Sequence, residues 1–354
     1  RILTGIATLR RQVEGLAFQT RLGGPIARLV PQQFRAFFGD ETALQASGLV
    51  RDEGGFLLEA LEIDSAALSL QATAETTSDW FLRRLEMSAV IDDGTPSPVV
   101  LPVPGGQTTV DRARLSLAYG EAVGEEWSGA LVIERLQTPE FLAEETRLTL
   151  GGTAENIDNP FERRLTFAIQ GALEGIAPAS PEIGEALGDR IALDVEGEWN
   201  AGEPLLIEEA LLSAQALEIS LTGAFEDLAF LGEIGVRTSS IAPFSALAER
   251  DLSGALDLRA SGEIWPVSGA FMLLLDGTVR ELRVDTPAID NLMDGETRIT
   301  GTLGRTPDGL SAQEFRVANE QLEFTADGTF ATGAADLTYA FGLADLGLIA
   351  PGAS

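Results

Sequence analysis

The sequence predicts an all-β protein built as an elongated antiparallel sheet, and three observations support this fold class. Apolar and polar residues alternate along many short segments, as in Leu217–Thr222 and Leu322–Asp327. Because successive strand residues point to opposite faces, each segment has one apolar and one polar face. Turn sequences separate the segments at short intervals, which favours meanders. The chain of 354 residues is also long for one compact core, and suits a fold that grows along one axis.

Short Asp-Gly, Asn-Ala-Gly and Pro-Asp-Gly sequences predict tight turns between strands. The predicted turns are Asp92–Gly94, Asn200–Gly202, Asp276–Gly277, Pro307–Gly309 and Asp327–Gly328. Four other stretches interrupt the strand pattern and are expected to be helical or irregular, because each begins with a proline that suits the first position of a helix. They are Pro25–Asp40, Pro181–Gly188, Pro243–Asp251 and Pro287–Gly295.

A loose repeat of the form apolar-x-apolar-x-small-x-small occurs four times at unequal spacing. Its copies begin at Leu68, Leu148, Leu217 and Leu322. The spacing differs from the fixed period of a solenoid, so we expect a repeated strand-turn-strand unit with insertions. No linker divides the chain convincingly, and it begins at an arginine. Residues 1–354 are therefore expected to form a single elongated segment, an internal fragment of a larger protein.

The composition argues against most catalytic chemistry. The chain contains no His, Cys or Lys, which removes the Ser-His-Asp triad, the thiolate nucleophile, the ordinary zinc site and the Schiff-base or phosphate-binding lysine. With 55 acidic and 24 basic residues, the net charge is −31. A field of this sign repels phosphate backbones. We expect no catalytic residues, no metal, no cofactor and no nucleic-acid partner.

The alternating apolar residues have two interpretations. They could form the buried core of a β-sandwich or barrel, or they could line an open, one-sided apolar groove. The irregular, open-ended repeat and the low aromatic content of 6% favour the groove. The expected lining residues are Leu68, Leu70, Leu148, Leu150, Leu217, Ile219, Leu221, Phe225, Leu322, Phe324 and Phe330.

Several stretches resemble a known superfamily in their strand and loop style. They are Leu205–Leu212, Leu217–Phe225, Ile241–Leu247, Leu252–Leu258, Thr300–Leu310 and Phe315–Val317. The sequence resembles the AsmA-like repeating β-groove superfamily, and most of all its TamB family (translocation and assembly module inner-membrane component). The resemblance covers most of the chain, and the motifs are short.

The resemblance implies a taco-shaped sheet that is curled along its length, with an apolar inner face and an acidic outer face. It also implies a periplasmic location, with anchoring to the inner membrane through an N-terminal helix outside this sequence. The implied partners are phospholipid acyl chains and, through other absent regions, an outer-membrane BamA-like barrel. The implied roles are passage of phospholipid along the groove and assistance to outer-membrane protein assembly. No catalytic residues transfer from the family.

Two other functions remain open. A carboxylate-based glycosidase or lyase on a β-helix would need two acidic side chains about 5–9.5 Å apart. Adjacent strand residues face opposite ways, which makes the acidic pairs of this chain poor candidates. These pairs are Asp92-Asp93, Glu125-Glu126, Glu144-Glu145 and Glu208-Glu209. A secreted structural or adhesive β-repeat protein would suit the acidity, although the chain lacks the usual calcium-loop motifs.

Two arginine pairs, Arg83-Arg84 and Arg163-Arg164, are candidates for contact with lipid headgroups. The interpretation we favour is that they point outward and balance nearby acidic residues.

Overall fold

The computed structural model describes residues 4–25, 27, 30–103, 107–120, 124–331 and 334–345. Contacts divide the chain into two compact units. Unit 1 comprises Arg1–Ala179 and Glu198–Glu203, and unit 2 comprises Ser180–Gly197 and Pro204–Ser354. The expectation of a single segment over residues 1–354 stays a prediction.

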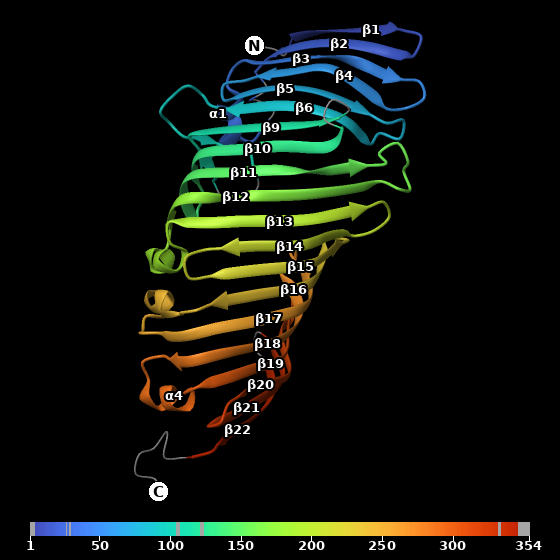
Figure 1. Cartoon of the computed structure of the whole chain (residues 1–354). Coiled ribbons are helices and arrows are strands. Elements are labelled where there is room, and N and C mark those ends of the chain that lie inside the picture. The colour runs from blue at the N-terminus through green and yellow to red at the C-terminus, as the bar shows by residue number, and fades with distance from the viewer. Residues whose placement is uncertain are drawn as a thin grey trace. The chain divides into compact units, whose positions relative to one another are not determined.

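Unit 1 is an antiparallel meander (Figure 1). Its strands are β1 (Thr4–Arg11), β2 (Gly15–Gly24), β3 (Thr42–Arg51), β4 (Phe56–Asp64), β5 (Leu68–Thr76), β6 (Leu82–Ile91), β7 (Val99–Val100), β8 (Thr109–Val110), β9 (Arg112–Gly120), β10 (Gly124–Gln137), β11 (Phe141–Glu155) and β12 (Arg164–Pro178). The long strands pair in chain order, with β9 following β6. The short strands β7 and β8 pair with each other.

Unit 2 is also an antiparallel meander. Its strands are β14 (Leu205–Ser213), β15 (Glu218–Glu226), β16 (Ala229–Thr238), β17 (Ser253–Trp265), β18 (Ala270–Arg283), β19 (Glu296–Thr306), β20 (Gly309–Ala318), β21 (Leu322–Ala331) and β22 (Ala334–Leu343). Each of these strands pairs antiparallel with the next. Strand β13 (Arg190–Asn200) begins in unit 2 and ends in unit 1.

Short helices occur in all four stretches that the sequence marks as interruptions. They are the 3-10 turn η2 (Gln32–Phe34) with α1 (Arg35–Phe38), η3 (Pro181–Ile183) with α2 (Gly184–Leu187), η4 (Ala242–Phe244) with α3 (Ser245–Ala248), and α4 (Pro287–Leu292). Strands make up 67% of the chain and helices 8%, which confirms the predicted all-β antiparallel class with a few short helices. Within each unit the sheet is uncurled, which differs from the taco-shaped curl that the family resemblance implies.

The predicted turns Asn200–Gly202 and Pro307–Gly309 are confirmed, Asp92–Gly94 instead begins the longer loop between β6 and β7, and the other two are wrong. Asp276–Gly277 lies inside β18 and Asp327–Gly328 lies inside β21. In β21, Gly328 has a φ of 140°, and a Cβ there would lie 2.0 Å from the carbonyl oxygen of Asp336. Glycine is needed at this position because the neighbouring strand approaches closely, and not because the chain turns.

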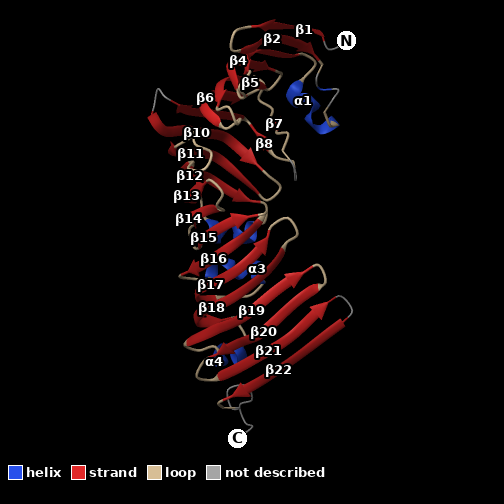
Figure 2. Ribbon diagram, turned by 90° about the vertical axis from the view of Figure 1, so that its right-hand side faces the viewer, coloured by secondary structure: helices blue, strands red, loops and turns tan. Residues whose placement is uncertain are grey.

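The strand connections alternate between two ends of the sheet in each unit. Among the described residues, one end has the short helices and the β7–β8 pair, and we call it the helix margin. The described connections at the other end are turns without helices, and we call it the tip margin. Figure 2 shows α1 beside β7 and β8, on one face of the unit 1 sheet. The extensive contacts between described elements are those between neighbouring strands and those at the helix margin, so each sheet is a single layer.

The helices are tied to hairpin turns that follow later in the chain. The Ala67 N–H donates to the Phe37 carbonyl at 3.1 Å, and the Ala216 N–H donates to the Ala186 carbonyl at 2.9 Å. At α4, the Asn319 side-chain amide donates to the Leu292 carbonyl at 2.7 Å. These bonds satisfy carbonyls that a helix end leaves without a partner.

The tied turns give a structural basis to three copies of the sequence repeat. The copies at Leu68, Leu217 and Leu322 each begin directly after a turn that is bonded to a helix. The fourth, at Leu148, lies in the middle of β11 and follows no such turn. Helix, hairpin and tied turn therefore form the repeated element.

A hydrophobic cluster closes the helix margin of unit 1. Its buried members are Phe37, Ala67, Val99, Val110 and Ala113. Half-buried residues of β5, β6 and β10 pack against it, among them Leu68, Ile91 and Ile133. The α1 segment and β7–β8 thus cover the sheet at this end only.

The cluster leads to a stability prediction. We expect Phe37→Ala to lower the free energy of unfolding of unit 1 by about 3–5 kcal/mol, because a 4% exposed ring is replaced by a cavity. Phe161→Ala, at a position that is 89% exposed, should change it by less than about 0.5 kcal/mol. Guanidinium denaturation followed by circular dichroism would measure both. Equal midpoints for the two variants would contradict a closed helix margin.

Candidate functional site

The register of the strands aligns apolar residues on one face of each unit. Residues directly opposite each other on antiparallel strands project to the same face and contact each other. A row of such partners can therefore be followed from strand to strand. We call the side defined by these rows the apolar face, and the other side the polar face.

In unit 1 the central row of the apolar face crosses ten strands. Its members, from β1 to β12, are Gly5, Leu22, Leu44, Ile63, Leu70, Ala89, Leu115, Leu131, Leu148 and Gly171. All of them are apolar or glycine. The row beside it contains Met87, Leu117 and Leu150 on β6, β9 and β11. The apolar surface is therefore continuous across the strands of this unit.

Unit 2 has an equivalent row across nine strands. Its members, from β14 to β22, are Leu212, Ile219, Val236, Leu258, Gly277, Ile299, Val317, Phe324 and Phe341. A neighbouring row passes through Leu221, Ile234 and Leu275. At the tip margin, Phe225 is paired with Phe230, with ring centroids 5.1 Å apart.

The structure places the predicted lining residues on these two faces. Leu70 and Leu148 are in the central row of unit 1, and Ile219 and Phe324 are in that of unit 2. Leu68, Leu150, Leu221 and Leu322 lie in neighbouring rows on the same faces, and Phe225 and Phe330 lie three rows away, toward the tip margin. Leu217 precedes the first residue of β15.

Exposure separates an open face from a closed core. Of the predicted residues, Leu322 is buried and Phe330 is exposed, while the others, such as Leu70 and Leu148, are half-buried. Side chains in the core of a two-layer sandwich would be sealed from water. In the described part of the chain, these rows lie on single-layer sheets and remain accessible.

The polar face is held in register by ion pairs. In unit 1 a row of Arg21, Gln45, Glu62 and Gln71 crosses β2 to β5. In unit 2, Arg237 lies between two acidic neighbours, with nitrogen–oxygen distances of 3.3 Å to Glu218 and 3.2 Å to Asp257. A one-residue slip would exchange the two faces of a strand, so these pairs favour the observed register.

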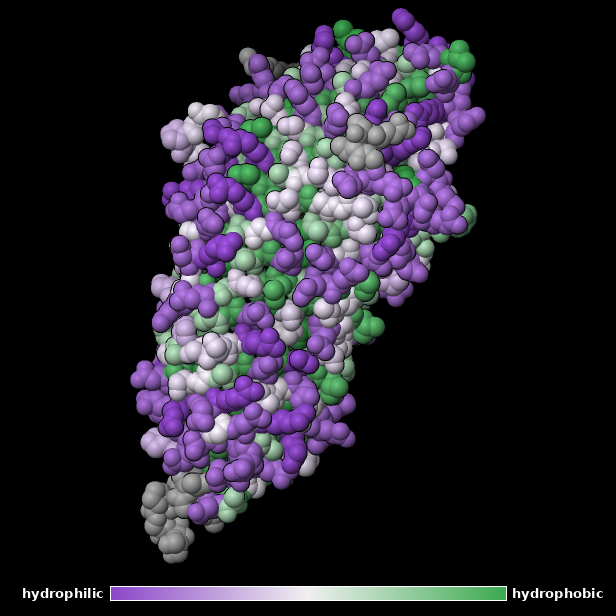
Figure 3. All heavy atoms as spheres, in the orientation of Figure 1, coloured by the Kyte–Doolittle hydropathy of each residue, from purple (hydrophilic) through white to green (hydrophobic). Residues whose placement is uncertain are grey.

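Figure 3 shows hydrophilic residues over much of the displayed side, with hydrophobic residues among them along the middle of the strands and at several points of the border at the tip margin. Burial raises the pKa of the Tyr119 phenol, which lies at the tip end of β9 opposite Trp127. Burial, together with the nearby Asp158 carboxylate, therefore disfavours the charged form of this phenol.

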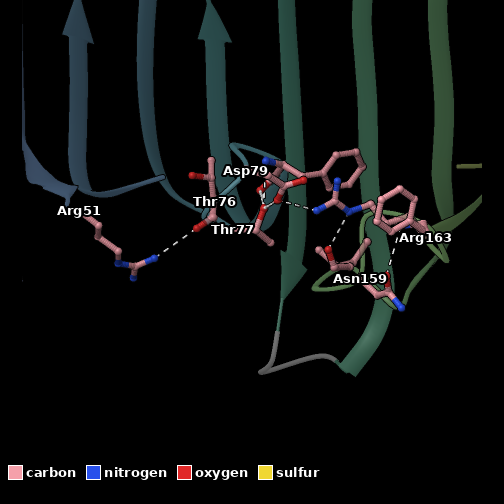
Figure 4. A network of polar contacts seen from close by, with 9 residues as sticks. Arg51, Thr76, Thr77, Asp79, Asn159 and Arg163 are labelled. Atoms are coloured by element: carbon pink, nitrogen blue, oxygen red, sulfur yellow. Dashed lines mark hydrogen bonds and ion pairs between the residues drawn. The ribbon is translucent and has the colours of Figure 1, made fainter. Parts of the chain in front are cut away.

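A buried arginine joins two turns and the end of a strand at the tip margin of unit 1 (Figure 4). The Arg163 guanidinium donates to the Asp79 carboxylate and to the Ile157 carbonyl, both at 2.7 Å. It also lies 4.2 Å from the centroid of the Phe81 ring, which stacks on Trp199. The cluster thus connects the β5–β6 turn, the β11–β12 turn and the end of β13.

The charge of Asp79 is stabilised within this cluster. The hydrogen bond from Arg163, followed by that from the Thr77 hydroxyl, holds the pKa of Asp79 well below its ordinary value. Because the pKa of Asp79 is lower in the folded chain than in the unfolded chain, its negative charge stabilises the folded state at any pH above the unfolded-state pKa. This contribution decreases as the pH falls below the unfolded-state pKa and is lost once the pH has passed through the folded-state pKa. At neutral pH the Arg163–Asp79 ion pair therefore stabilises the fold of the tip margin.

The other arginines of the two pairs lie at the surface and contact acids. Arg164 is 2.6 Å from Glu198, Arg83 is 3.6 Å from Asp158, and Arg84 is 3.8 Å from Glu75. The favoured interpretation of outward, charge-balancing residues fits these three, and it is wrong for Arg163, which is buried.

The acidic pairs show structural roles where their contacts are defined. Asp92 accepts from the Gly94 N–H and from Arg112, which together lower the pKa of Asp92. Glu145 forms an ion pair with Arg147 on the same strand. Among the described residues, no group of three or more acidic residues is arranged to hold a metal ion.

Comparisons with known proteins returned no matching family, no matching curated protein and no matching solved structure. Within the described residues, no helix has the length and apolarity needed to cross a bilayer.

The Arg163 cluster gives a prediction with a neighbouring control. Arg163→Met should lower the free energy of unfolding of unit 1, with about 1–3 kcal/mol arising from the Ile157 carbonyl left without a donor. Arg164→Met changes the next residue, whose side chain is 47% exposed against 7% for Arg163, and should have little effect. Thermal denaturation would compare them, and equal losses would show that the Arg163 contacts do not stabilise the tip margin.

Proposed function

We propose that this chain is a periplasmic segment of a TamB-like intermembrane bridge whose apolar faces bind phospholipid acyl chains. The observation that supports this most is the pair of central rows, in which apolar or glycine residues continue from strand to strand and stay accessible. A soluble protein seldom exposes a continuous apolar surface unless it binds an apolar partner.

The physical chemistry of acyl chains suits such a surface. Each methylene gains about 0.8 kcal/mol on leaving water, and this gain requires no specific hydrogen bond. A conduit for acyl chains therefore needs apolar side chains without a fixed polar motif. Ten strands spaced about 4.8 Å apart give unit 1 a central row of roughly 45 Å.

The polar face has the complementary property. Its acidic residues and ion pairs keep an apolar-rich sheet in solution. The proposal includes the second family role, assistance to outer-membrane protein assembly, since an apolar face can also shield an unfolded apolar strand. An outer-membrane BamA-like barrel would be the partner in that role, through regions outside this sequence.

The competing functions have weaker support. A glycosidase would use paired carboxylates, and Asp92 and Glu145 are instead engaged by arginines. An adhesive β-repeat protein would need no continuous apolar face. We therefore propose a binding and transfer role without catalysis.

Two adjacent residues of β11 provide the test. Leu148 is in the central apolar row, and Thr149 is exposed on the polar face. Leu148→Asp should weaken phospholipid binding about tenfold, because the charged side chain would leave about two methylenes of the acyl chain in contact with water instead of with the apolar face. Thr149→Asp introduces the same charge on the other face and should bind like the unchanged chain.

Binding is measured by titrating the purified chain with a fluorescent phosphatidylcholine, with circular dichroism to check that both variants keep their strand content. Equal binding by Leu148→Asp and Thr149→Asp would reject the apolar face as the lipid site. Unfolding of Leu148→Asp alone would indicate a covered core.

A further inference from the structure

The two margins of unit 1 differ in what bounds the apolar face. At the helix margin, α1 and the β7–β8 pair fill the space with their own side chains, including the buried Phe37 and Val110. At the tip margin the described connections of unit 1 are turns without helices or further strands. An apolar ligand that moves sideways off the face therefore meets packed protein at one end and solvent at the other.

The turns of the tip margin have apolar residues that point into solvent. In unit 1, Val13 in the β1–β2 turn is 98% exposed, and Phe161 in the β11–β12 turn is 89% exposed. Trp80 in the β5–β6 turn is also exposed. In unit 2, Leu228 and Val267 occupy the same place in the β15–β16 and β17–β18 turns. Turns usually have polar residues at their tips, so this pattern requires an explanation.

All four tryptophans of the chain lie at the tip margin of their unit. Trp80 is in a turn, Trp127 lies opposite Tyr119 at the tip end of β10, and Trp199 stacks on Phe81. Trp265 is the last residue of β17, before the β17–β18 turn. Tryptophan is enriched where hydrocarbon meets water, because its ring is apolar and its N–H is polar.

From these margins we infer that acyl chains enter and leave the apolar face sideways across the tip margin, directly from a bilayer surface. The exposed turn residues insert at the interface and bring the edge of the apolar face that lies along the tip margin to the lipid. Trp127 fits this position, because its N–H donates to the Thr166 carbonyl at 3.0 Å while the residue belongs to an apolar-face row. The inference rests on the proposed function and adds the route of loading.

The net charge of the chain indicates which lipid headgroups the membrane surface should have. A net charge of −31 repels anionic bilayers, and the arginines near the unit 1 tips are engaged by acids, as in the Arg11–Asp52 and Arg83–Asp158 pairs. The lipid surface that fits is zwitterionic, such as phosphatidylcholine or phosphatidylethanolamine.

Unit 2 offers matched variants for the test. Leu228→Ser with Val267→Ser removes two exposed apolar residues from the tip margin. Leu247→Ser with Ile289→Ser removes two exposed apolar residues from α3 and α4 at the helix margin. Val13→Ser with Phe161→Ser is a second tip pair, in unit 1. All six side chains are exposed, so each variant should fold.

The experiment mixes the full chain with phosphatidylcholine vesicles that contain a fluorescent phosphatidylcholine, and follows the rate and the final extent of uptake. Each tip pair should slow uptake about tenfold or more, because the apolar contacts with the interface are lost, and should leave the final extent unchanged. The helix-margin pair should load at the unchanged rate.

The outcomes separate the route from the function. If the unchanged chain takes up lipid and the tip pairs load equally fast, loading across the tip margin is wrong and the proposed function stands. Slower loading by the helix-margin pair alone would also overturn the inference. If the unchanged chain takes up no lipid, the proposed function fails and the route with it.

Discussion

The antiparallel register is the constraint on which the rest of the structure depends. Because side chains alternate with a period of two, one choice of register places Leu131 opposite Leu148 and Ile219 opposite Val236. The same choice places Arg237 between Glu218 and Asp257 on the other side. Apolar contacts on one face and ion pairs on the other therefore support the same pairing, and a slip would lose both.

The alternating pattern was sufficient to predict the class and the positions of the apolar residues. Period two fixes the face of a residue once its strand is known, so Leu70, Ile219 and Phe324 could each be assigned to the apolar face of its own strand without coordinates. The four proline-led interruptions could be found for a similar reason, since proline at a helix start has a local signature. The curl expected from the family resemblance has no local signature in the sequence, and the sheet is uncurled.

Other features depend on contacts between distant residues, which a local pattern does not report. Arg163 is buried because it meets Asp79, 84 positions earlier in the chain. Asp327–Gly328 has the composition of a turn but lies within a strand, because β22 approaches its backbone. The four tryptophans are far apart in sequence, yet each lies in or near a turn, and counting alternate turns assigns all four to the tip margin.

Native mass spectrometry of the chain would show whether the apolar faces are open and bind lipid. The chain would be purified without detergent, and the bound molecules would be released and identified by lipid analysis. Open apolar faces should hold several phospholipid molecules per chain, and the mass added by these molecules should disappear when they are released. A monodisperse chain free of lipid would contradict this expectation, and would indicate that the apolar faces are covered by protein in solution.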